Sequence, residues 1–151
     1  MQSITVKDVI DNTLPETGWE KFRIYVFRDE DFIFYVGKTQ ENIIDRLEAH
    51  LGLTDRYESL VGKLVEDNAP PSYLWSIDLY TIDECVPMIR RHYPDARGID
   101  IDLVESAMIL EHSPALNQQI NPHPHALPPK YTTKRDARMF DAFKKAFNDS
   151  R

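Results

Sequence analysis

The pattern of apolar and polar residues along the chain predicts three β-strands. Two apolar segments, 22–27 and 32–36, are rich in aromatic and β-branched residues and flank the acidic turn 28–31. So short a connection predicts an antiparallel hairpin. In a third segment, 73–82, apolar and polar residues alternate, which indicates a strand with one buried face and one polar face.

Apolar residues at helical spacing predict helices around these strands. The expected helices cover residues 4–12, 39–51, 57–66, 84–93, 100–112 and 132–148. Thr39 is expected to be the N-cap of the second helix, and Asp83 is expected to cap the fourth. This order of elements predicts an α+β fold in which a small, mostly antiparallel, three-stranded central sheet is flanked by helices, with an extra C-terminal helix.

Composition divides the chain into four segments. Residues 1–20 are predicted to form a helix and a loop, 21–121 the main domain, 122–129 a proline-rich extended linker, and 130–151 a basic amphipathic helix. The length of 151 residues and the hydrophobic content of 42% suit a single domain with its own core.

The charge of the chain is distributed unevenly. The net charge is −7, but residues 130–151 carry seven Lys/Arg and three Asp, so this tail is basic within an acidic protein. The acidic balance argues against a broadly basic nucleic-acid binder. A polyanionic partner is therefore expected to be held by a local patch, with Lys134, Arg135 and Arg138 of the tail among its contacts.

Location can be predicted from what the sequence lacks. Cys85 is the single cysteine, so no internal disulfide is expected. The sequence shows no apolar run long enough to span a bilayer, and its N-terminus lacks the pattern of a signal peptide. These features favour a cytoplasmic protein that does not associate with membranes.

Chemically useful residues recur around the predicted hairpin. Ile24-Tyr25-Val26 lies in the first strand and Tyr35-Val36-Gly37 ends the second. Arg46 stands eleven residues after Tyr35, and His50 follows one helical turn later. Further on, Glu105 precedes Asn117 by twelve residues, with Pro114 between them.

This arrangement resembles the paired motif and downstream residues of the GIY-YIG nuclease superfamily. The resemblance covers residues 21–120, with Arg23 at the family's first glycine and Val36 at its second isoleucine. It implies a stand-alone GIY-YIG-like nuclease domain over residues 21–121. The implied activity is metal-dependent endonucleolytic hydrolysis of phosphodiester bonds in DNA, with Mg²⁺ as the metal and Mn²⁺ as a substitute.

The resemblance also implies roles for the motif residues. Glu105 would bind the metal ion, which favours oxygen ligands. Arg46 would hold two phosphate oxygens through its planar fork. Tyr25 would act as general base, and His50 would hydrogen-bond to Tyr25 or relay its proton. The remaining expected contributions come from Tyr35 and Lys38, which would contact phosphate, and from Asn117, which would anchor the backbone beside the site.

Two other functions stay open from the sequence alone. One is a catalytically inactive nucleic-acid-binding module that keeps the fold, which the acidic balance and Arg23 favour. The other is a protein-interaction domain whose Phe-rich C-terminal helix docks on a partner or on a second copy. If one active site cuts both DNA strands, a homodimer is favoured. His123 and His125 alternate with prolines and have no acidic neighbour, so we interpret them as loop residues rather than metal ligands.

Overall fold

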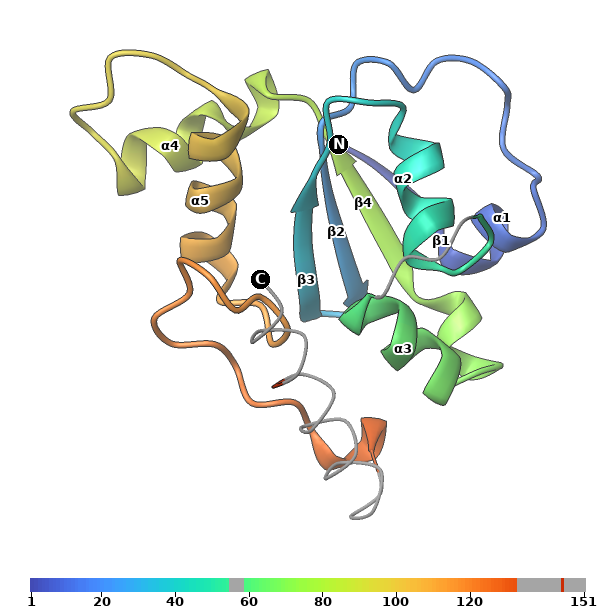
Figure 1. Cartoon of the computed structure of the whole chain (residues 1–151). Coiled ribbons are helices and arrows are strands. Elements are labelled where there is room, and N and C mark those ends of the chain that lie inside the picture. Colours follow the sequence, from blue (N-terminus) through green and yellow to red (C-terminus); the bar gives the residue numbers. More distant parts are fainter. Residues whose placement is uncertain (55–58, 133–144, 146–151) are drawn as a thin grey trace.

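The protein, seen here in a computed structural model, is built on a four-stranded antiparallel sheet (Figure 1). Residues 1–54, 59–132 and 145 are described. The strands are β1 (Gln2–Thr5), β2 (Ile24–Asp29), β3 (Phe32–Lys38) and β4 (Ser76–Tyr80), in the order β1-β4-β2-β3. The α+β class and the antiparallel hairpin are confirmed. The expected number of three strands is one too few, because β1 adds an edge strand next to β4.

Strand β1, which the sequence did not predict, lies where a single helix was expected. Residues 4–12 divide at Thr5, because Ile4 pairs with Ile77 of β4 while Thr5 is the N-cap of α1 (Val6–Ile10). The Thr5 side chain accepts a hydrogen bond from the Asp8 N–H, and Asp8 accepts one from the Thr5 N–H. This reciprocal capping box starts the helix where the strand ends.

Four longer helices complete the described part of the chain. They are α2 (Ile43–His50), α3 (Leu60–Asp67), α4 (Val86–His92) and α5 (Ile101–His112), together with 3-10 turns at Pro71–Leu74, Asp83–Cys85 and Pro129–Tyr131. Two expected caps are wrong. Asn42, not Thr39, caps α2, since its side-chain oxygen accepts the N–H of Ile44. Asp83 opens a 3-10 turn that leads directly into α4 without a side-chain cap.

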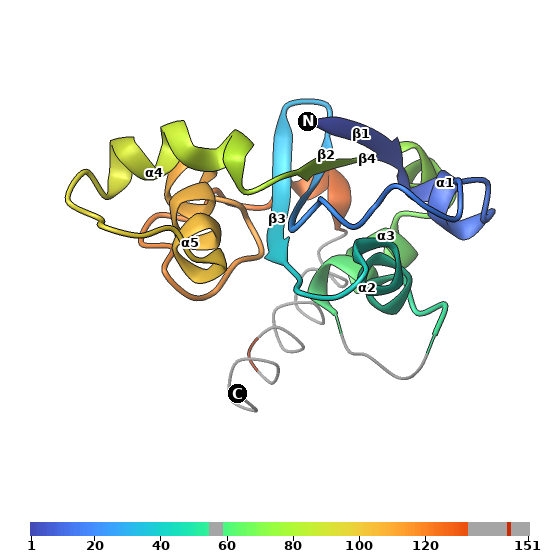
Figure 2. The ribbon, with the colours of Figure 1, turned by 90° about the horizontal axis from the view of Figure 1, so that it is seen from above.

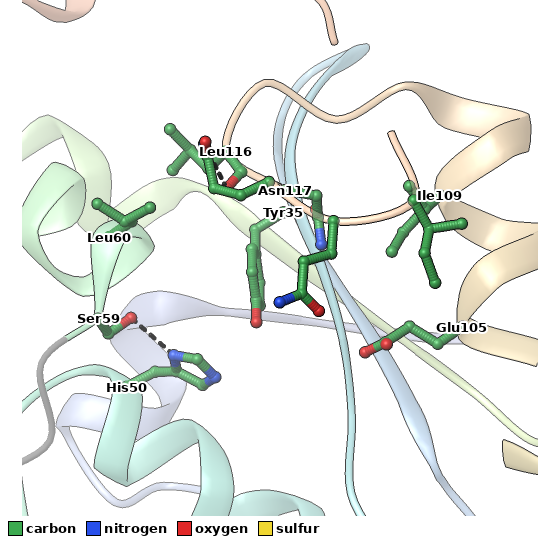
Figure 3. A pocket seen from close by; sticks show the side chains of 11 residues that line it. Tyr35, His50, Ser59, Leu60, Glu105, Ile109, Leu116 and Asn117 are labelled. Atoms are coloured by element: carbon green, nitrogen blue, oxygen red, sulfur yellow. Dashed lines mark hydrogen bonds between the residues drawn. The ribbon is translucent and has the colours of Figure 1, made fainter. Parts of the chain in front are cut away.

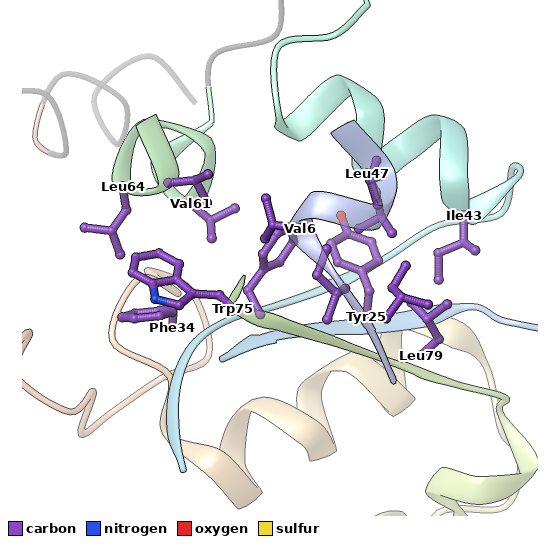
Figure 4. Close-up of a cluster of buried hydrophobic side chains, with 14 of the residues drawn as sticks. Val6, Tyr25, Phe34, Ile43, Leu47, Val61, Leu64, Trp75 and Leu79 are labelled. Carbon is purple, nitrogen blue, oxygen red and sulfur yellow. The ribbon is translucent and has the colours of Figure 1, made fainter. Parts of the chain in front are cut away.

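Helices cover both faces of the sheet (Figures 1 and 2). Helices α1, α2 and α3 lie on one side, and α4 and α5 lie on the other, where α5 packs against β3. Side chains of β2 alternate between the two layers. Tyr25 and Phe27 join an aromatic-rich cluster under α2 and α3 (Figure 4), whereas Ile24 and Val26 join an aliphatic cluster under α4 and α5.

A bulge in β3 places two neighbouring aromatic residues, Phe34 and Tyr35, on one side of the sheet. Phe27 pairs with Tyr35, but the next residue, Arg28, pairs with Ile33, so Phe34 is the extra residue in β3. Phe34 and Tyr35 both contact the aromatic-rich cluster. Tyr35 faces the same side of the sheet as Tyr25 because it pairs with Phe27, and the bulge turns Phe34 to that side as well.

The segment after α5 returns to the sheet. No helix or strand forms between residues 113 and 128, but Tyr131 is buried, and its hydroxyl donates a 2.7 Å hydrogen bond to Asp29. Its ring packs against Phe34 and Trp75. The predicted helix over residues 132–148 lies almost entirely outside the described residues. No helix within residues 1–54, 59–132 and 145 has the length and apolarity needed to cross a membrane.

Candidate active site

Tyr25 lies at the centre of the candidate site and is almost completely buried, with 1% of its surface exposed. Its ring packs directly against the backbone of Gly37 in the neighbouring strand. A Cβ atom at position 37 would lie 2.3 Å from Tyr25 Cζ, which is far inside contact distance. Only glycine therefore allows this approach, and this accounts for the glycine of the second motif.

Helix α2 brings Arg46 and His50 to the Tyr25 hydroxyl. His50 Nε2 lies 2.6 Å from the Tyr25 oxygen, and Arg46 Nε donates to the same oxygen over 3.4 Å. The two side chains reach one atom because they are four residues apart on the helix. The hydrogen bond expected between His50 and Tyr25 is thus present, and Arg46 lies beside it. The catalytic roles of these residues stay predictions.

Behind His50 stands a residue that the sequence analysis missed. Ser59 Oγ lies 2.7 Å from His50 Nδ1, and it also accepts the Gly62 N–H as the N-cap of α3. Gly62 lets α3 approach the end of α2, since a Cβ there would lie 1.9 Å from the His50 carbonyl oxygen. A serine before an apolar helix is a recognisable cap signal, but its contact with His50 depends on the tertiary fold.

Burial determines the protonation state of His50. Only 3% of the His50 surface is exposed, and desolvation, together with the smaller effect of the nearby Arg46 charge, lowers the pKa of His50 to about 3. His50 is therefore a neutral imidazole at physiological pH.

The opposite side of the site is ionic and more open. Glu105 projects from α5, and its carboxylate lies 3.4 Å from Lys38 Nζ at the end of β3. Lys38 also forms a closer ion pair with Asp102, one helical turn before Glu105, another residue that the sequence analysis missed. The hydrogen bond to Asp102 is the largest effect raising the pKa of Lys38, and the Glu105 charge raises it as well.

A cleft separates the two sides (Figure 3). It has a volume of about 70 Å³, and Tyr35, His50 and Ser59 line it opposite Glu105. The Tyr35 ring centre lies 5.5 Å from that of His50. A cavity of this size has room for several water molecules.

Asn117 fixes the edge of β3 beside this cleft. Its side-chain oxygen accepts the Val36 N–H and its amide nitrogen donates to the Val36 carbonyl oxygen, both over 2.9 Å. The expected backbone anchor is thus present. A contact of Asn117 with substrate, or of Tyr35 and Lys38 with phosphate, stays a prediction. Three further predicted contact residues, Lys134, Arg135 and Arg138, lie outside the described residues.

Arg23, at the position of the first motif glycine, is accommodated at the start of the hairpin. Its N–H donates to the Tyr80 carbonyl oxygen, and its carbonyl oxygen accepts the Thr39 N–H. The guanidinium reaches the carbonyl oxygen of Glu41 over 3.3 Å. Arg23 does not adopt a positive φ, so this position does not require a glycine backbone conformation.

Glu105 is the candidate metal ligand at the cleft. Within the described ranges, no group of three or more His, Cys, Asp or Glu side chains is arranged to hold a metal ion. A metal bound by Glu105 would therefore need water and substrate oxygens as its other ligands. Mg²⁺ suits such a site because it commonly keeps several waters and binds through one or two carboxylates and substrate phosphates.

Comparisons with known proteins add no identification. No family model, no curated protein and no solved structure matches this chain.

Proposed function

We propose that the protein is a metal-dependent endonuclease of the GIY-YIG superfamily that hydrolyses phosphodiester bonds in DNA. The observation that carries the proposal is the convergence of His50 and Arg46 on the Tyr25 oxygen, across a cleft from Glu105. These residues come from three separate elements of the fold. His50 and Glu105 line the cleft from opposite sides, and Tyr25 and Arg46 join His50 behind it, which supports a common chemical purpose.

Within this proposal, β2, β3 and β4 form the family-like three-stranded core. The edge strand β1 is then an addition that extends the sheet beyond β4. Both motif tyrosines lie on the core strands, while α2 supplies Arg46 and His50 and α5 supplies Glu105 from opposite faces of the sheet. The proposed chemistry depends on the β2–β3 hairpin and on these two helices, and not on β1.

The proposed reaction adds water across a P–O bond. Ionised Tyr25 takes one proton from the water, and the water oxygen bonds to phosphorus. The leaving oxygen takes a proton from solvent water as its bond to phosphorus breaks, and Tyr25 afterwards returns its proton to solvent. Arg46 stabilises the charge that develops on the phosphate oxygens. Because the Tyr25 oxygen is held by buried neighbours, its position is largely fixed before substrate arrives.

Glu105 would hold the Mg²⁺ ion, or Mn²⁺ in its place. When bound, the metal would supply Lewis-acid stabilisation of the phosphate. Lys38 competes for this carboxylate, but its closer partner is Asp102. Asp102 can therefore retain the ammonium group while Glu105 turns toward the metal. The Glu105 side chain is 21% exposed, which leaves it access to the cleft.

DNA is the proposed partner, and the basic tail would supply part of its affinity. The residues before the tail carry an excess of acid, so a phosphate backbone would be repelled from most of that surface. One cleft per chain would favour a homodimer if both DNA strands are cut.

A second candidate is a nucleic-acid-binding module without catalysis. The ion pair between Lys38 and Glu105 favours it, because the carboxylate then has a cationic partner without any metal. In that case the cleft would bind a phosphate-containing ligand and leave it intact.

Supercoiled plasmid distinguishes the two candidates. Purified protein is incubated with plasmid in Mg²⁺, Mn²⁺ or EDTA, beside a Glu105→Ala control. The endonuclease proposal predicts nicking with either metal, none in EDTA, and none with the variant. Plasmid that stays intact in both metals, together with a mobility shift in EDTA, would instead support the binding module.

A further inference from the structure

The hydrogen-bond partners of Ser59 determine the direction of the bonds around His50. Ser59 is 7% exposed, and its oxygen already accepts the Gly62 N–H over 3.1 Å. Among the residues that the structure describes, the other polar group at hydrogen-bond distance from Ser59 Oγ is His50 Nδ1, at 2.7 Å. A buried hydroxyl hydrogen needs an acceptor, because an unsatisfied buried donor costs about 1–3 kcal/mol.

The Ser59 hydroxyl therefore donates to His50 Nδ1, and this nitrogen carries no hydrogen. A neutral imidazole holds its single N–H on one of the two ring nitrogens. The hydrogen of His50 then lies on Nε2, which is 2.6 Å from the Tyr25 oxygen. His50 is the donor in this bond.

We infer that Ser59 is a positioning residue that fixes His50 as the Nε2–H tautomer, so that the Tyr25 oxygen receives hydrogen bonds from His50 and Arg46 together. Both donors point at one oxygen that is buried between them. Such an arrangement stabilises negative charge on that oxygen, as the donors of an oxyanion hole do. The two donors thus stabilise the ionised form of Tyr25, which burial alone would disfavour.

Because His50 donates its hydrogen bond to Tyr25, one of the two roles expected for His50 is excluded. An Nε2 atom that carries a hydrogen cannot accept the proton of Tyr25, so His50 does not relay that proton. The consequence for catalysis rests on the proposed endonuclease function. Ionised Tyr25 takes the proton from water, and His50 keeps its own hydrogen throughout. Ser59 acts through His50 and does not touch the reacting atoms.

Ring-nitrogen NMR tests the tautomer without any cleavage assay. The full chain is labelled with ¹⁵N-histidine, and long-range ¹H–¹⁵N correlations are recorded near pH 7. His50 is identified by the signals lost in His50→Gln. We expect an unprotonated Nδ1 and a protonated Nε2 at His50. A hydrogen on Nδ1 in the wild-type protein would overturn the inference.

Two substitutions test whether Ser59 is the cause. Ser59→Asp can still cap α3 but, once ionised, has no hydrogen to donate, so Nδ1 of His50 should gain a hydrogen. Ser59→Thr keeps both the cap and the hydroxyl, and should keep the Nε2–H tautomer. If Ser59→Asp does not fold, Ser59→Ala applies the same test, since His50 should then lose its single tautomer. An unchanged tautomer in the folded Asp or Ala variant would reject the role of Ser59.

Plasmid nicking then links the tautomer to function. Ser59→Ala should slow nicking by about 10-fold or more, because the donor to Tyr25 is no longer fixed. Thr5→Ala removes a comparable cap from α1 and should leave nicking unchanged. A wild-type protein that shows the Nε2–H tautomer but does not nick DNA would support the inference about Ser59 and reject the proposed function. A protein that nicks DNA but carries the His50 hydrogen on Nδ1 would support the proposed function and reject the inference about Ser59.

Discussion

The candidate site has two sides, here called its walls, which are built from different kinds of polar contact. On one wall, Tyr25, His50 and Ser59 are buried and hydrogen-bonded in a chain. On the other wall, Lys38 and Asp102 form an ion pair in which the Asp102 side chain is 76% exposed. Buried polar groups are costly to separate, whereas exposed ion pairs contribute about 0–1 kcal/mol. The first wall is therefore fixed by folding, and the second can rearrange when a ligand arrives.

A large effect on cleavage is expected from the proposed phosphate contact of Arg46, which lies beside the buried wall. We expect Arg46→Lys to slow DNA cleavage nearly as much as Arg46→Ala, on the order of 10²–10³-fold. Lysine keeps the charge but cannot hold two phosphate oxygens in one plane. Single-turnover cleavage rates measure the effect, and Arg90→Lys on the exposed surface of α4 is the matched control. If Arg46→Lys kept most of the activity, Arg46 would act only as a distant charge.

The buried wall should also make stability depend on pH. The pKa of His50 is lowered to about 3 in the folded protein, so between about pH 6.5 and pH 3 the unfolded chain binds a proton that the folded chain does not. Stability should therefore fall as the pH falls through this window, by at most about 1.4 kcal/mol per pH unit from this group.

Denaturant unfolding at several pH values measures this dependence. His50→Gln removes the titrating ring, so the stability advantage of the wild-type protein over this variant should shrink toward low pH. His123→Gln, at an exposed position, controls for the substitution itself. A difference between wild type and His50→Gln that stayed constant down to pH 4 would contradict the burial of a neutral imidazole.

Direct comparison of the walls predicts unequal losses of stability. Tyr25→Phe removes the hydrogen bonds of the buried hydroxyl to His50 and Arg46 and should cost about 1–3 kcal/mol of unfolding free energy. Asp102→Asn breaks only the exposed ion pair and should cost less than about 1 kcal/mol. Equal losses in denaturant unfolding would show that the two walls do not differ as described.

The elements that could be predicted from sequence are those with strong local patterns. The β2–β3 hairpin and α5 were predicted within a few residues, since enrichment in aromatic and β-branched residues and helical spacing are local signals. Strand β1 was not predicted, because only Ile4 of its four residues is buried and its partner β4 lies more than 70 residues away.

The difference between local patterns and long-range contacts also applies to the candidate site. Tyr25, Arg46 and His50 could be proposed because their spacing resembles a known motif. Ser59 and Asp102 could not, since their partners His50 and Lys38 are brought to them by tertiary packing. Asp78 was expected on a polar face but is buried, and its carboxylate pairs with Arg28 over 2.6 Å. A polar residue in an alternating strand does not reveal whether water or a partner covers it.

A smaller expected effect concerns DNA affinity. We expect the basic tail to supply much of the affinity and little of the chemistry. Each phosphate it neutralises should contribute roughly −0.9 to the slope of log affinity against log salt. Because Tyr131 is a buried core residue, the chain should be cut after Thr132, which keeps that ring in place. The shortened protein should bind DNA more weakly and with a shallower salt slope.

The melting temperature and size of the shortened protein are checked first, to exclude misfolding or loss of a dimer. A folded truncation that retained the full salt slope would show that the tail does not hold DNA.

Metal-dependent nicking by Glu105 variants tests the central claim most directly. Glu105→Gln keeps the shape of the side chain but removes the charge that would bind Mg²⁺. Glu111→Gln makes the same change on the same helix, at an exposed carboxylate paired with Arg91. With both variants folded, we predict that Glu105→Gln abolishes nicking of supercoiled plasmid in Mg²⁺ while Glu111→Gln nicks at the wild-type rate. Unchanged nicking by folded Glu105→Gln would contradict the proposed site.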